Sequence, residues 1–267
     1  GLVCVPTAVS MPRREIEYRF ETFPPKVIIT DPESADMIDE VIADLELSPK
    51  VKLVIGEKDG WIPLADIETF DRSADAADTL SDDILFCFFT SGTTGLPKRV
   101  GHTAVSYPAG HLSTSLMMGL RPDDIHNGLS ESGWSRSIWS RFFAPFNIGA
   151  TTSGFKFPLQ DGEQYLDAIS RHKITSFCAL PRAWRMIAKM NLDSFDLSSL
   201  RQAICIGDPL PPEICETWQQ ATGIPIRELY SQTEASTMLG NSPWMTDEIR
   251  PGSFGRPVGM YDLALAD

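Results

Sequence analysis

The feature that most constrains this sequence is an apolar run, residues 84–89, that leads directly into a loop of small and hydroxylic residues. The run has the length and composition of a buried strand. Two glycines in the loop allow a sharp turn and a close approach of the backbone to a ligand. Hydroxyls, amides and a terminal lysine are groups that bind phosphate oxygens. The loop consists of Thr90, Ser91, Gly92, Thr93, Thr94, Gly95, Leu96, Pro97 and Lys98.

We interpret this loop as a nucleotide-phosphate site. The alternative is a flexible Ser/Thr/Gly linker, which seldom follows an apolar strand. The loop is not the P-loop of kinases and GTPases, because Leu96 and Pro97 separate Gly95 from Lys98. All nine residues instead resemble the phosphate loop of the adenylate-forming, or AMP-binding, superfamily, which includes acyl-CoA synthetases, luciferases and peptide-synthetase adenylation domains.

Composition excludes several classes of function. The net charge of −13 argues against a nucleic-acid-binding surface, although it does not argue against binding ATP through a local loop. No apolar run approaches the roughly 20 residues of a membrane span. The five cysteines lack CxxC spacing and suit a reducing compartment, and the four histidines lack the spacing of zinc ligands.

Segments with the composition of strands alternate with segments whose apolar residues recur at helical spacing. This alternation favours parallel strands joined by right-handed crossovers. The predicted fold class is therefore α/β, with parallel or mixed sheets and helices packed on their faces. Strands are expected at residues 2–5, 26–30, 51–55, 84–89, 174–180, 201–206, 224–229 and 261–266. Helices are expected at residues 10–23, 31–45, 104–118, 164–170, 182–190 and 211–222.

Three unusual loops, residues 90–98, 207–209 and 230–234, each follow the carboxyl end of a predicted strand. Ligands of open α/β sheets bind at that edge. In the last loop, a ring at Tyr230 offers a stacking surface for adenine, a hydroxyl at Thr233 suits a phosphate oxygen, and a carboxylate at Glu234 suits Mg²⁺. Taken alone, such residues at a strand end are more often structural.

The same segment resembles the Tyr-Gly-x-Thr-Glu motif of the adenylate-forming enzymes. The resemblance implies that Tyr230 packs on adenine, that Thr233 contacts phosphate and the substrate carboxylate, and that Glu234 serves Mg²⁺. The medium-chain acyl-CoA synthetase pattern is Glu-Gly-Tyr-Gly-Gln-Thr-Glu, and here Leu229 and Ser231 replace the glycines. We expect these two side chains to crowd the adenine. The segment as a whole is Glu228, Leu229, Tyr230, Ser231, Gln232, Thr233 and Glu234.

Further segments carry weaker resemblances. Gly207, Asp208 and Pro209 resemble the Gly-Glu-Pro wall of the family's adenine pocket, although a plain strand exit has the same composition. Residues 251–257 resemble the family's Pro-Gly-Ser-x-Gly-x-Pro turn, whose role is mainly structural. Residues 131–134 resemble an Asp-Thr-Gly-Trp segment, and ordinary core packing is the competing explanation for its tryptophan. The implied acyl pocket consists of Trp134, Met238, Leu239 and Gly240.

The resemblance covers essentially the whole chain and is nearest to medium-chain acyl-CoA synthetases. It implies that residues 1–267 are an internal fragment of the adenylation core, part of a layered αβαβα fold, without the small C-terminal domain. The implied reaction activates a carboxylic, or fatty, acid with ATP to an acyl-adenylate and then to a CoA thioester. Lys98, Thr233 and Glu234 are the expected catalytic residues, with Mg²⁺ at Glu234.

As an isolated fragment, the chain is expected to be weakly active or inactive. The alternative from another class is a non-catalytic nucleotide- or acyl-binding remnant of such an enzyme. A dinucleotide-binding Rossmann protein is disfavoured, because no GxGxxG follows an early strand. The expected location is the cytoplasm or the mitochondrial matrix. The sequence leaves the acyl chain length, the thiol acceptor and the oligomeric state open.

Overall fold

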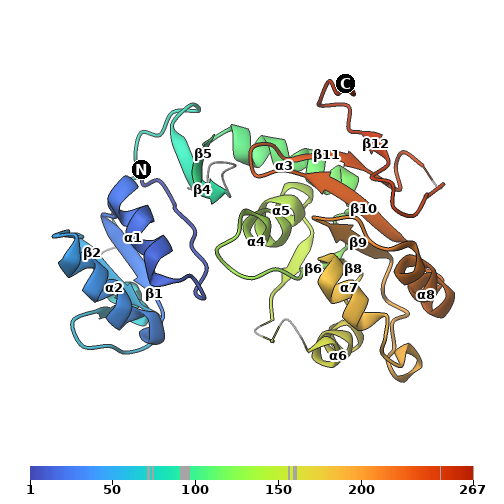
Figure 1. The fold of residues 1–267 in the computed structure, drawn as a ribbon, viewed down its shortest axis with the longest axis horizontal. Helices are drawn as coiled ribbons and strands as arrows, with labels where there is room; N and C mark the ends of the chain where they lie inside the picture. Colours follow the sequence, from blue (N-terminus) through green and yellow to red (C-terminus); the bar gives the residue numbers. More distant parts are fainter. Residues whose placement is uncertain are drawn as a thin grey trace. The chain divides into compact units, whose positions relative to one another are not determined.

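The structure is a computed structural model that describes residues 1–70, 73, 75–90, 97–155, 157–158, 161–246 and 248–266. The chain forms two compact units. One comprises Gly1 and Thr7–Asp78, and the other comprises Leu2–Pro6 and Thr79–Asp267. Figure 1 shows the order of the helices and strands along the chain.

The first unit is a three-stranded parallel sheet, in the order β1-β2-β3, with two helices. Asp31 caps α2 by accepting a hydrogen bond from the amide of Ser34 (2.8 Å), as expected where an Asp-Pro pair begins a helix. The crossover between parallel strands predicted for this part of the chain is confirmed. The elements are α1 (Arg13–Thr22), β1 (Val27–Thr30), α2 (Pro32–Asp44), β2 (Val51–Val54), β3 (Ile62–Pro63) and η1 (Leu64–Thr69).

The second unit is built on a seven-stranded sheet in the order β12-β11-β10-β9-β8-β6-β7. The five strands from β7 to β10 are parallel, and β11 and β12 are antiparallel. This mixed sheet agrees with the predicted fold class. Its strands are β6 (Ile125–Gly128), β7 (Thr151–Ser153), β8 (Ser176–Ala179), β9 (Gln202–Ile206), β10 (Ile226–Ser231), β11 (Thr237–Gly240) and β12 (Arg256–Pro257).

Helices cover both faces of this sheet, as the alternation of side chains along β9 shows. Ala203 and Cys205 pack in a cluster with residues of α6, α7 and α8. Ile204 and Ile206 pack in a second cluster with residues of α3 and α5. A strand buried on both faces reads as a continuous apolar run, which is why this segment was recognisable in the sequence. The helical segments are α3 (Ser106–Met117), α4 (Ser135–Ile138), η2 (Trp139–Phe143), α5 (Ala144–Ile148), α6 (Gly162–His172), α7 (Pro181–Ile187), η3 (Leu192–Ser194) and α8 (Pro212–Thr222).

The apolar run before the phosphate loop requires a correction. It forms β4 (Ile84–Thr90), which pairs antiparallel with β5 (Lys98–Thr103) in a separate two-stranded sheet. The expectation that the loop after this strand leaves the same sheet as the loops at residues 207–209 and 230–234 is therefore wrong. A short connection permits only an antiparallel partner, whereas a parallel one needs a crossover of a dozen or more residues. The polar residues of β5 concealed that partner in the sequence.

The predictions of strands at the two ends of the chain also require correction. Residues 2–5 contribute one isolated bridge, between Cys4 and Phe86, and residues 261–266 form no strand. Short apolar runs carry no information about whether a pairing partner lies within reach. Among the residues that the structure describes, no helix is long and apolar enough to cross a membrane.

A buried histidine predicts how stability depends on pH. His126 lies in β6 with its Nδ1 atom 2.9 Å from Ser176 Oγ, and burial lowers its pKa from the ordinary value of 6.5 to about 4, against an opposing effect of Asp124. The unfolded chain therefore binds more protons than the folded one between these values. We expect this group to lower the unfolding free energy by up to about 1.4 kcal/mol per unit as the pH falls from 6.5 towards 4.

Denaturant unfolding from pH 7 to 4.5 measures this effect. His126→Gln should flatten the pH dependence relative to wild type, and His172→Gln, at an exposed position, should leave it unchanged. Equal pH dependence in wild type and His126→Gln would contradict the assignment.

Candidate functional site

The β4–β5 hairpin ends where the predicted phosphate loop begins. Thr90 and Lys98 are Cα partners, the pair of the ladder nearest the connecting loop, and the Lys98 side chain is exposed. Pro97 is half-buried beside it. The remaining predicted phosphate-binding residues, Ser91, Gly92, Thr93, Thr94, Gly95 and Leu96, lie outside the described residues.

Two contacts join this hairpin to the loop that follows β10. Thr90 Oγ1 donates to Glu234 Oε1 at 3.4 Å, and His102 Nε2 of β5 lies 2.6 Å from the carbonyl oxygen of Thr233. The first pair is separated by 144 positions in the chain. The structure therefore brings the hydroxyl at the start of the phosphate loop to the carboxylate predicted to serve a metal.

A cluster of aromatic rings holds the hairpin in this position. Phe86 and Phe88 of β4 lie 4.9 and 5.5 Å from the ring of Tyr107 in α3, measured between centroids. His102 contacts the same ring edge-on at 4.9 Å. Burial raises the pKa of Tyr107, so its hydroxyl remains a hydrogen-bond donor, and it donates to the carbonyl of Ser135 at 3.2 Å. The aromatic cluster thus links β4, β5 and α3 to the start of α4.

The other two predicted loops meet at one edge of the sheet. β9 and β10 are parallel neighbours, with Ile206 the Cα partner of Leu229, so residues 207–209 and 232–234 leave the sheet at the same carboxyl edge. Gly207 has φ of +119°, a conformation that side chains disfavour. Asp208 and Pro209 are exposed. This juxtaposition is the one expected of a ligand site in an α/β sheet.

The start of α4 adds side chains to the same edge. Ser135 Oγ lies 3.3 Å from Thr233 Oγ1. Trp134, the residue predicted to line an acyl pocket, is the N-cap of α4 and is 54% exposed. An indole this exposed is not core packing, which was the alternative explanation for it.

The ring predicted to stack on adenine has one aromatic neighbour. Tyr230 lies 5.4 Å from Phe254, between centroids, and its hydroxyl accepts from Gln232 Nε2 at 3.0 Å. Phe254 belongs to the turn at residues 251–257. That turn therefore supports the ring of Tyr230 from one side.

Glu228 and Leu229 face the interior. The Glu228 carboxylate is 1% exposed and accepts from the amides of Leu210 and Gly252, each at 2.9 Å. It thus ties the turn after β9 to the turn at residues 251–257. Leu229 is fully buried in the core, so its side chain is absent from the open edge where we expected it to crowd the adenine. Ser231 is half-buried beside a register shift in the β10–β11 pairing.

Residues 238–240 form part of β11. Met238 and Leu239 are half-buried. A Cβ atom at Gly240 would lie 2.6 Å from Leu229 Cδ2 and 2.9 Å from Met117 Sδ. This glycine therefore allows close packing of β11 against the core.

Removing the Glu228 carboxylate is expected to destabilise the protein. In Glu228→Ala, two amides lose their acceptor in a buried place, and each unsatisfied group costs about 1–3 kcal/mol. Chemical denaturation measures the loss. Glu228→Gln keeps the size and one acceptor oxygen, so its loss should be smaller. Equal stability of Glu228→Ala and wild type would show that the Glu228 carboxylate does not join the two turns.

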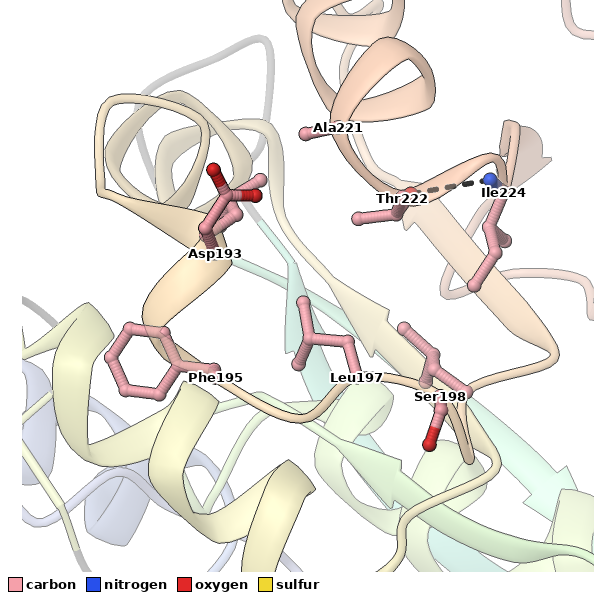
Figure 2. A pocket seen from close by; sticks show the side chains of 9 residues that line it. Asp193, Phe195, Leu197, Ser198, Ala221, Thr222 and Ile224 are labelled. Carbon is pink, nitrogen blue, oxygen red and sulfur yellow. Dashed lines mark hydrogen bonds between the residues drawn. The ribbon is translucent and has the colours of Figure 1, made fainter.

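A surface hollow of about 430 Å³ lies elsewhere in the second unit. Figure 2 shows Phe195 and Leu197 facing Thr222 and Ile224 across it. These residues precede β9 and β10, so the hollow lies at the amino ends of the strands, away from the edge described above. It shares no residue with the predicted site.

The contacts identify two residues that the sequence analysis missed, His102 and Ser135, and Arg136 follows Ser135 directly in α4. Their positions depend on the hairpin register and on where α4 begins. His102 is four residues after Lys98, and a hairpin in that register would have pointed to it. Ser135 and Arg136 directly follow Trp134, and no local pattern distinguishes them.

Comparisons with known proteins show the family of this chain. Residues 1–267 match the AMP-binding enzyme family. A 4-hydroxybutyrate–CoA ligase of Metallosphaera sedula is 39% identical over all of this chain, and a mitochondrial acyl-coenzyme A synthetase of Mus musculus is 33% identical. The chain spans 46% of the length of each relative.

Solved structures show the same fold. An anthranilate CoA ligase in complex with anthranoyl-AMP has a TM-score of 0.87 at 28% identity, covering 97% of this chain and 49% of its own. An acyl-CoA synthetase of Brucella canis has a TM-score of 0.83 at 25% identity, covering all of this chain and 49% of its own. The fold, the edge at which the loops converge and the match along the full sequence lead to one conclusion: this chain belongs to the AMP-binding enzyme family.

Proposed function

We propose that the protein to which this chain belongs activates a carboxylic acid with ATP, forming an acyl-adenylate, and then transfers the acyl group to the thiol of CoA. The observation that carries the proposal is the contact of Thr90 with Glu234 beside the Thr233 hydroxyl. It joins the predicted phosphate loop to the predicted adenylate loop. The acyl-CoA ligases among the relatives support the same reaction class.

In the first step, an oxygen of the substrate carboxylate attacks the α-phosphorus of ATP, and pyrophosphate leaves. Both reactants are anions, so positive charge and hydrogen-bond donors must offset the charge that develops. The exposed ammonium of Lys98 and the hydroxyls of Thr90 and Thr233 are the described groups suited to that role. His102 holds the Thr233 carbonyl and so orients the loop.

The oxygen donors at this place fit Mg²⁺. Glu234 supplies a carboxylate and Thr90 a hydroxyl, and Mg²⁺ prefers oxygen ligands completed by substrate phosphates. Within the described residues, no group of three or more His, Cys, Asp or Glu side chains forms a cage for a metal. Glu234 would therefore hold the ion together with ATP, and the bound ion would neutralise phosphate charge.

We assign adenine to the ring of Tyr230, which Phe254 supports, and to the edge formed by residues 207–209. We assign the acyl chain to the side of Trp134, Met238 and Leu239. In the second step, the CoA thiolate attacks the acyl carbon and AMP leaves. Fatty acids are one substrate class within this proposal, and the cytoplasm or mitochondrial matrix remains the proposed location.

A non-catalytic nucleotide- or acyl-binding role is the second candidate. This chain spans 46% of the length of the relatives that it matches, so the assay has to compare it with the full-length protein. Pyrophosphate release with a panel of carboxylic acids, run on the 267-residue chain and on the full-length protein, separates the two. Calorimetric titration with Mg·ATP runs beside it. Pyrophosphate release by the full-length protein supports the ligase. Binding of Mg·ATP without release supports the second candidate. If neither release nor binding is observed, both candidates are contradicted.

A further inference from the structure

The guanidinium of one arginine at the site has no hydrogen-bond or ion-pair partner among the described residues. Arg136 is the second residue of α4, and its guanidinium Nη1 lies 4.0 Å from the point that a Cβ atom on Gly207 would occupy. Its Nε atom is buried without a hydrogen-bond partner. Among the described residues, no hydrogen bond or ion pair of its guanidinium is found, whereas its backbone carbonyl accepts from the amide of Trp139 within the helix. Burial of the side chain lowers its pKa, and Asp208 and two buried thiols partly oppose that shift.

Arg141, five positions along the same helical segment, is an arginine with a structural role and serves as a comparison. Its Nε donates to the carbonyl of Gly128 at 2.8 Å, and its Nη2 donates to the carbonyl of Ser130 at 2.6 Å. Those bonds fix the loop that leaves β6. Burying a guanidinium atom without such bonds is unfavourable, so a structural role does not account for Arg136.

The position of Arg136 indicates what it meets. The hairpin contacts the loop after β10 through Thr233 and Glu234. Ser135 contacts Thr233, and the next residue, Arg136, lies against Gly207 after β9. Arg136 is thus one strand further along the sheet than the predicted reaction centre. Arg136 also lies two positions after Trp134, the N-cap of α4, which we assign to the acyl chain, so a group that reaches its guanidinium belongs to the acyl part of the substrate.

Gly207 borders the space beside this guanidinium. A Cβ atom there would lie 3.2 Å from Leu180 Cδ2 and 4.0 Å from Arg136 Nη1. The surroundings are therefore an apolar wall, a backbone turn and a cation without a partner. This combination accommodates a short acyl chain that ends in a hydrogen-bond acceptor.

We propose that Arg136 is a specificity-determining residue that donates hydrogen bonds to an oxygen at the distal end of the acyl substrate, a hydroxyl or a carboxylate. This inference rests on the proposed ligase function and names its substrate class. A purely alkyl acid leaves the guanidinium unpaired. An acid with a distal oxygen satisfies it.

Binding of stable acyl-adenylate analogues tests the proposal on the full-length protein. Three acyl-sulfamoyl adenosines serve as probes: pentanoyl, its 4-hydroxybutyryl isostere, and succinyl. Hydrogen bonds to a charged donor predict that the hydroxyl and carboxylate probes bind about 10- to 100-fold more tightly than pentanoyl. Arg136→Met should abolish that preference while leaving pentanoyl affinity within a few-fold of wild type.

The controls separate the outcomes. Arg136→Lys should retain part of the preference, and Arg182→Met, at an exposed arginine of α7, should retain all of it. Circular dichroism checks that each variant is folded. If all probes bind wild type equally, or if Arg136→Met weakens all three equally, the inference is wrong while the proposed function stands. If no probe binds, the proposed function fails and the inference fails with it. Comparison of the two polar probes shows whether the oxygen is neutral or charged.

Discussion

Replacing Glu234 by glutamine is expected to slow acyl-adenylate formation by about 10²–10³-fold, the effect of removing one electrostatic contributor from an active site. Glutamine has the size of glutamate and can still accept the hydrogen bond from Thr90. It cannot supply the negative charge that holds a cation against the phosphates. The loss should therefore appear in the rate and in the Mg²⁺ dependence, with little change in stability.

Pyrophosphate release by the full-length protein measures this loss. Glu216→Gln makes the same chemical change at an exposed position on α8 and should leave the rate unaffected. Lys98→Met should also slow the reaction, since it removes the mobile positive charge at the hairpin. A Glu234→Gln rate within two-fold of wild type would remove this carboxylate from the mechanism.

Replacing Arg201 by methionine is expected to destabilise the protein by about 3–5 kcal/mol, because the buried carboxylate of Asp124 loses its countercharge. Asp124 is 2% exposed and pairs with the Arg201 guanidinium. It also accepts from the amide of Arg121 and the hydroxyl of Thr175, each at 2.7 Å. Residues that precede β6, β8 and β9 thus meet at one buried carboxylate, at the amino ends of the strands.

Denaturant unfolding of Arg201→Met, Asp124→Asn and the double variant forms a cycle that isolates the pair. The double variant should be less destabilised than the sum of the single variants, because removing both partners leaves no unpaired charge. The exposed pair of Lys173 and Asp196 is the control, and Lys173→Met should change stability little. Additive losses around the first cycle would contradict the pairing.

Local sequence patterns predicted the elements that begin with a clear cap or consist of a continuous apolar run. The helix after Asp31 begins where an acidic cap precedes a proline, and the strand predicted at residues 201–206 forms as Gln202–Ile206, which is buried along its whole length. The hairpin partner β5 was missed, because its charged and polar residues give no apolar alternation. β6 was missed because two of its four residues are a buried histidine and a buried asparagine.

In the site, likewise, residues within sequence motifs could be predicted, whereas residues brought there by tertiary packing could not. Motif resemblance predicted that Thr90 and Glu234 serve one ligand, and the structure places them in contact. It could not predict His102, Ser135 or Arg136, because each reaches the site through tertiary packing and not through its sequence neighbours. The burial of Leu229 likewise depends on the pleat of β10, which a single residue type does not reveal.

The central claim is that the β4–β5 hairpin and the loop after β10 bind one nucleotide between them. A crystal structure of the protein with Mg·ATP tests it most directly. The account predicts phosphate oxygens within hydrogen-bonding distance of Thr233 and of the hairpin that ends at Lys98, a metal ion beside Glu234, and adenine against Tyr230. A nucleotide that contacts only one of these two segments, or that lies in the hollow of Figure 2, would contradict it.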